Sequence, residues 1–131
     1  MKKISTLIIF CGITLSVNAQ ANIDSLRKVW NDATQVDTVR LYAIDELAWD
    51  ARYKNTDSSI LLANFELEYA KGKNLKWWQA NACNLLGVAY YIKSNYTKAI
   101  EWHWLTIILA LFITTWEIQQ RPSSIIRKVL I

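Results

Sequence analysis

The sequence is poor in the residues from which most enzymatic sites are built. It has one histidine, His103, three glycines and two cysteines among 131 residues. A Gly-rich phosphate loop, a metal-ligand spacing and a nucleophile motif are all missing from it. A cysteine nucleophile needs an oriented base, and His103 has no evident carboxylate partner in the sequence. We therefore expect no enzymatic activity, no catalytic or metal-ligating residue and no cofactor.

Cysteine is too scarce for a disulfide. Cys11 lies in the first 20 residues, which we expect to be removed, so the mature chain keeps only Cys83. A single cysteine cannot form an internal disulfide, and the fold must be stabilised by packing. Cys83 stands in an apolar helical run, where a buried cysteine behaves as a small hydrophobic residue.

Excess charge is missing from the central part of the chain. The formal net charge is +4, but residues 21–103 contain ten Lys and Arg and ten Asp and Glu, which cancel. The surplus comes from the two ends: Lys2, Lys3, Arg121, Arg127 and Lys128, against Glu117. A nucleic-acid-binding protein carries its positive charge on the folded domain. We therefore expect no nucleic acid among the partners.

Residues 1–20 have the layout of a secretory signal peptide. Lys2 and Lys3 form a basic start, an apolar run extends from Leu7 to Leu15, and Ala19 is a small residue before the expected cleavage. This run is shorter than the roughly 20 residues that a membrane-spanning helix needs. We expect export through the signal peptide to a periplasmic or secreted location.

Helical periodicity dominates the rest of the chain as far as Glu101. Apolar residues recur at three- and four-residue spacing, and no useful strand-like alternation occurs. Asp37 and Asp57 are placed to cap helix starts, and Gly72 suits a helix end. Short loops between helices favour antiparallel neighbours. We expect an all-α fold with helices over residues 23–32, 38–54, 58–72 and 75–93, and a further helix that begins at Tyr96.

Two candidate polar or aromatic sites have simpler explanations. Asp45, Glu46 and Asp50 place carboxylates one helical turn apart, which is typical of a solvated face. Trp77 and Trp78 are adjacent and point in different directions, so we expect at least one of them to be core rather than a sugar-stacking surface.

The helical region contains an internal repeat. Leu47 aligns with Leu86 and Ala48 with Gly87, an offset of 39 residues in both cases (86 − 47 and 87 − 48). We place one unit at about 40–78 and a second at 79–103 onward, within a repeat region of residues 21–103. A periodicity of this length is typical of stacked helical repeats.

The second unit resembles the tetratricopeptide repeat, whose pattern is W-x2-L-G-x2-Y and then A-x3-F. Cys83 takes the place of the tryptophan, and Leu86, Gly87, Tyr90 and Ala99 match the positions that follow. Gly87 and Ala99 are small because two helices are expected to cross there, while Leu86 and Tyr90 fill the space between them. The "KSNYTKAIE" segment is similar to the turn and second-helix start of the family.

The first unit matches this family more loosely. Ile44, Leu47 and Ala48 fit the pattern, whereas Ala51 replaces the tyrosine and Glu66 stands where a small residue is usual. The resemblance covers about 60 of the 131 residues. It implies antiparallel helix pairs stacked into an α-solenoid.

The resemblance also implies a function. Such arrays bind a protein or peptide partner in a concave groove, which the family pattern places on Asn81, Asn84, Val88 and Tyr91. Exported arrays of this type resemble the sensing or scaffold part of longer signalling proteins. We therefore expect a non-catalytic protein–protein interaction module in signal transduction. The equally simple alternative is that these four residues are ordinary helix surface.

The repeat pattern fails after Glu101, and residues 104–131 form an atypical apolar and basic tail. One hypothesis is a frameshift with a deletion, which would make the chain a truncated fragment. Another is a membrane anchor over Trp104–Trp116, which would make it a small membrane-tethered protein, although 13 residues rise only about 20 Å. A third is a packed apolar helix.

Overall fold

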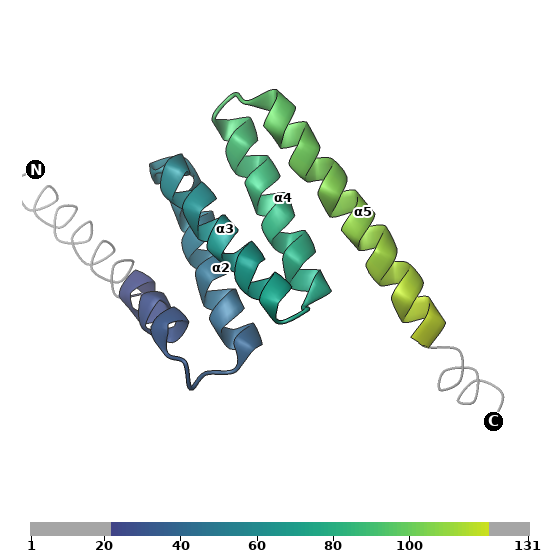
Figure 1. Ribbon diagram of the computed structural model, residues 1–131. Coiled ribbons are helices and arrows are strands. Elements are labelled where there is room, and N and C mark those ends of the chain that lie inside the picture. The colour runs from purple at the N-terminus through teal and green to yellow at the C-terminus, as the bar shows by residue number, and fades with distance from the viewer. Residues whose placement is uncertain (1–21, 121–131) are drawn as a thin grey trace, which may run out of the picture.

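The computed structural model describes residues 22–120, with side chains as far as residue 115. A short helix covers residues 22–31. Four longer helices follow: α2 (Asp37–Lys54), α3 (Thr56–Gly72), α4 (Lys76–Ile92) and α5 (Tyr96–Gln120). Successive helices lie side by side and antiparallel (Figure 1). The all-α fold of packed helix pairs that the periodicity predicts is confirmed, and the expected signal peptide lies outside the described residues.

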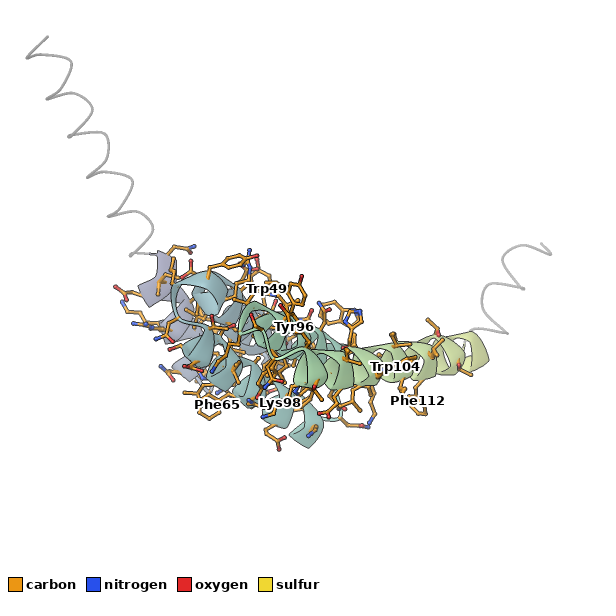
Figure 2. All side chains as sticks on the ribbon, turned by 90° about the horizontal axis from the view of Figure 1, so that it is seen from above. Trp49, Phe65, Tyr96, Lys98, Trp104 and Phe112 are labelled. Carbon is orange, nitrogen blue, oxygen red and sulfur yellow. The ribbon has the colours of Figure 1, made fainter. Side chains whose placement is uncertain are left out.

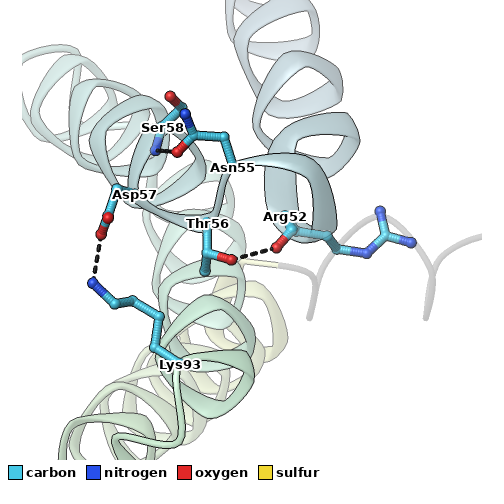
Figure 3. A network of polar contacts seen from close by, with 6 residues as sticks. All are labelled: Arg52, Asn55, Thr56, Asp57, Ser58 and Lys93. Atoms are coloured by element: carbon cyan, nitrogen blue, oxygen red, sulfur yellow. Dashed lines mark hydrogen bonds and ion pairs between the residues drawn. The ribbon is translucent and has the colours of Figure 1, made fainter.

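The predicted caps are wrong by one or two residues. Val36, not Asp37, is the residue that precedes α2. Its backbone is extended, and its side chain makes no capping hydrogen bond. Asn55 caps α3 by accepting a hydrogen bond from the backbone N–H of Ser58 at 3.1 Å. Asp57 lies in the first turn instead, where it forms an ion pair with Lys93 (Figure 3). Acidic residues are stabilising in a first turn even when they do not cap it, because they face the positive end of the helix dipole.

The turns after α3 and α4 share one conformation. Gly72 ends α3 as expected, but the left-handed residue is Asn74, with φ of 55°, and its counterpart after α4 is Ser94, with φ of 59°. The N–H of Leu75 donates to Ala70 and that of Asn74 to Lys71, which satisfies the last carbonyls of the helix. Identical turn geometry sends α4 and α5 back along their predecessors in the same way.

Small residues allow the helices to approach closely. One core cluster joins all four long helices, with Trp102 and Leu109 of α5 packed on its edge. Its buried members are Ala48, Ala63, Leu67, Ala82, Cys83, Leu85 and Leu86. A second cluster of Leu41, Ile44 and Ala70 holds the short helix through Trp30.

The last helix is longer than its neighbour and only partly packed. α5 has 25 residues against 17 in α4, so it extends beyond the other helices (Figure 1). It continues without interruption past residue 103, where the repeat pattern in the sequence ends. Within residues 22–120, no helix combines the length and hydropathy that crossing a membrane requires.

Candidate protein-interaction groove

An open groove runs along the contact between α4 and α5. It contains two cavities, of about 430 Å³ and about 330 Å³. On α4 the groove is lined by residues at alternating four- and three-residue spacing, which places them on one side of the helix. They are Trp77, Asn81, Asn84, Val88 and Tyr91. All four residues that the sequence assigns to a partner-binding groove therefore lie along it.

The larger cavity is almost entirely apolar. Val88 and Tyr91 line it from α4, and Tyr96, Ile100 and His103 line it from α5. The rings of Tyr91 and Tyr96 meet edge to face with centroids 5.6 Å apart. Such rings present large contact area at a low cost in conformational entropy, which is typical of surfaces that bind proteins.

Gly87 and Ala99 form the floor of this cavity. A Cβ atom added to Gly87 would lie 3.5 Å from the backbone oxygen of Ala99 and 3.7 Å from the backbone nitrogen of His103. These are ordinary contact distances, so the site has room for a methyl group. Leu86 is fully buried in the first core cluster, and Tyr90 packs against that cluster.

The equivalent groove of the first helix pair is filled. The offset of 39 residues carries α2 onto α4, and an offset of 40 carries α3 onto α5, because Asn55 and Asn95 begin their helices in the same way (95 − 55). α4 packs along α2 and α3 and covers Ala63, Leu67 and Ala70. The counterparts on α5 are His103, Ile107 and Ala110. Leu67 is 4% exposed and Ile107 is 40% exposed, so the same position is covered in one pair and open in the other.

A polar cluster marks the filled groove. The side-chain amide of Asn81 on α4 donates to Asp45 Oδ1 on α2 at 2.8 Å and to Glu66 Oε1 on α3 at 3.2 Å. Glu66 is fully buried, and its Oε2 has no hydrogen-bond partner among the residues that the structure describes. Asn81 therefore joins the two helix pairs as well as lining the open groove.

Burial sets the protonation of both carboxyl groups. It raises the pKa of Glu66 to about 8, with the nearby charge of Asp45 adding to the effect. It raises the pKa of Asp45 to about 6, although the hydrogen bond from Asn81 acts in the opposite direction. Because the charged form of a buried carboxyl group is disfavoured, Glu66 is mostly neutral at neutral pH. Of the three carboxylates expected on a solvated face, Glu46 and Asp50 are exposed, whereas Asp45 is half-buried where Asn81 of α4 reaches it.

The aromatic pair Trp77–Trp78 divides between core and surface. Trp78 packs against the second core cluster, whereas Trp77 is 59% exposed and lines the smaller cavity. Cys83 is buried, and burial raises the pKa of its thiol. The different surroundings of Trp77 and Trp78 follow from the different directions in which adjacent helical residues point.

The sequence did not predict that Glu66 is buried and hydrogen-bonded to Asn81. The one indication was that a carboxylate stands where the tetratricopeptide pattern usually has a small residue. The partner Asn81 was assigned to the groove, and the contact between the two joins residues on different helices.

Comparison of the chain with protein-family models, curated proteins and solved structures found no match.

Proposed function

We propose that this protein is a non-catalytic interaction module of the tetratricopeptide-repeat type, which binds a protein or peptide partner in the α4/α5 groove. The observation that supports this most is the contrast between the two helix pairs. The first pair has its groove filled by α4, and the second presents the same groove open, with cavities of about 430 Å³ and about 330 Å³. Apolar concave surfaces with a few polar groups are typical binding sites.

The lining indicates the chemistry of the partner. Val88 and Tyr91 offer apolar contact at one end of the groove, and Asn84 and Thr106 offer hydrogen-bonding groups at the other. No Asp, Glu, Lys or Arg side chain lines either cavity. A partner segment with apolar side chains and one amide or hydroxyl group complements this lining.

The cellular role rests on the sequence. The signal-peptide layout of residues 1–20 and the repeat resemblance together support an exported protein, periplasmic or secreted, that serves as the sensing or scaffold part of a longer signalling protein. In that role the groove would transmit a binding event rather than catalyse a reaction.

Photo-crosslinking in the native host tests the binding function. Benzoylphenylalanine at Tyr91, which is 64% exposed in the groove, should yield covalent adducts with protein after irradiation. The matched control is Phe65, an aromatic residue of α3 that is 51% exposed and away from the groove. Equal labelling at both positions, or none at Tyr91, would contradict the proposal.

A further inference from the structure

The outer side of α5 carries a continuous apolar stripe. Ile100, Trp104, Ile107 and Leu111 follow a 4-3-4 spacing, which is that of a coiled-coil seam. They are 58%, 61%, 40% and 63% exposed. Figure 2 shows Trp104 and Phe112 along the part of α5 that extends from the packed helices. Exposed apolar patches of this kind mark interaction surfaces.

This stripe borders the open groove. Ile100 lines the larger cavity together with Val88 and Tyr91, so the stripe meets the groove at this residue. In the first pair the helix that fills the groove is α4, which runs antiparallel to α3. A helix that fills the second groove in the same way must run antiparallel to α5.

A second copy of this chain supplies such a helix. Two α5 helices related by a two-fold axis perpendicular to them are antiparallel, as the groove requires. Among the described residues, α5 is also the helix with the longest exposed apolar stripe.

The charge pattern favours this self-pairing. A two-fold axis brings identical surfaces together, so any charge near the axis meets a charge of the same sign. Between Trp102 and Trp116 the sequence has no Asp, Glu, Lys or Arg, and His103 is its one titratable residue. The groove side of α4 is likewise uncharged from Trp77 to Tyr91.

We propose that the protein forms a two-fold dimer in which α5 of a second copy packs antiparallel along the stripe and closes the α4/α5 groove. In the register that centres the stripe on the axis, Ile100 faces Leu111 of the other copy and Trp104 faces Ile107. The proposal rests on the proposed function, because it uses the groove as a protein-binding surface and names its occupant.

Sedimentation velocity of the protein, purified from its native host, tests the dimer. The wild-type protein should sediment as a dimer. Leu111→Lys places a charge within the apolar contact and should raise the dimer dissociation constant at least about tenfold. Phe65→Lys, a matched exposed position on α3, should leave it unchanged. Circular dichroism should show equal helix content in all three proteins.

A pair of cysteines across the axis gives an independent measurement. Trp104→Cys combined with Ile107→Cys places cysteines opposite each other in this register and should form an intermolecular disulfide on mild oxidation, whereas Phe65→Cys should not, with the buried Cys83 present in both. A monomeric or polydisperse wild-type protein, or equal intermolecular disulfide formation in both variants, would overturn the dimer. If Tyr91 still captures a different protein in that case, the proposed function stands without the dimer; if it captures none, both fall.

Discussion

The two helix pairs of this protein share one backbone plan and differ in what covers them. The second helix of each pair begins after an asparagine cap, Asn55 or Asn95, and both pairs cross where small side chains meet, at Ala48 against Ser59 and at Gly87 against Ala99. The α2/α3 groove is covered by α4 and carries two carboxyl groups, Glu66, which is buried, and Asp45, which is half-buried. The α4/α5 groove is open, uncharged and bordered by apolar side chains. The same groove is thus a core in one pair and a surface in the other.

The comparison explains why α5 has an unusual sequence. A helix that is apolar on more than one side is buried or is part of an interface. Trp102 and Leu109 pack against the core, whereas Ile107 and Leu111 do not. The side chains of the apolar stripe are therefore not buried by other parts of this chain, and the stripe lies beside the groove that remains open.

The largest expected effect comes from truncating equivalent residues in the two grooves. Leu67→Ala should lower the free energy of unfolding by about 2–5 kcal/mol, because Leu67 is 4% exposed beneath α4 and its removal leaves a cavity. Ile107→Ala, at the equivalent position on α5, should cost less than about 1 kcal/mol at low protein concentration, because Ile107 is already 40% exposed. Urea denaturation measures both. Equal losses would show that the second groove is not open in solution.

The buried carboxyl groups predict an unusual pH dependence. The pKa of Glu66 is raised from 4.5 to about 8 and that of Asp45 from 3.8 to about 6. The folded protein therefore binds more protons than the unfolded chain between about pH 4 and 8, and stability is highest below this window and is lost as the pH rises through it. We expect the free energy of unfolding to fall by a few kcal/mol across this range, as followed by thermal unfolding at each pH.

Glu66→Gln sharpens this test, because glutamine keeps the size and the hydrogen bond and cannot ionise. It should remove most of the fall above pH 6. The exposed Glu68→Gln is the matched control and should keep the wild-type profile. A profile that rises towards pH 8 would mean that Glu66 is charged and satisfied in the folded protein.

The crossing of α4 and α5 should tolerate one methyl group and no more. Gly87→Leu should cost about 1–3 kcal/mol through overpacking against Ala99 and the backbone at His103. Gly87→Ala should be neutral or slightly stabilising, because the added Cβ meets atoms at ordinary contact distance and alanine favours the helix. Melting temperatures of the two variants separate these effects. An unchanged value for Gly87→Leu would mean that the helices do not cross at this residue.

The sequence predicted the helices well and the polar contacts poorly, for a physical reason. Periodicity reports which side of a helix is apolar, and it predicted the helices, whereas the family resemblance put the groove on Asn84 and Val88, which lie on one side of α4. Caps depend on a single side chain, and Asn55 competes successfully with the nearby Asp57. The hydrogen bond between Asn81 and Glu66 joins positions 15 residues apart on different helices, and no local pattern encodes it. The continuation of α5 was obscured because most of its apolar residues, unlike Trp102 and Leu109, do not pack against this chain's core.

The smallest expected effect concerns the surface link between the two pairs. Lys93, just after α4, forms an ion pair with Asp57 at the start of α3, and the two side chains are 42% and 78% exposed (Figure 3). Exposed pairs contribute between about 0 and 1 kcal/mol, because solvent screens the attraction and ordering both side chains costs entropy. Asp57→Asn should therefore lower the free energy of unfolding by less than about 1 kcal/mol, most of it from the lost first-turn charge. Repeating the urea measurement at high salt should abolish even this difference, because salt screens both contributions. A larger, salt-independent loss would show that the helix pairs are joined through this surface contact and not through Asn81 and the buried core.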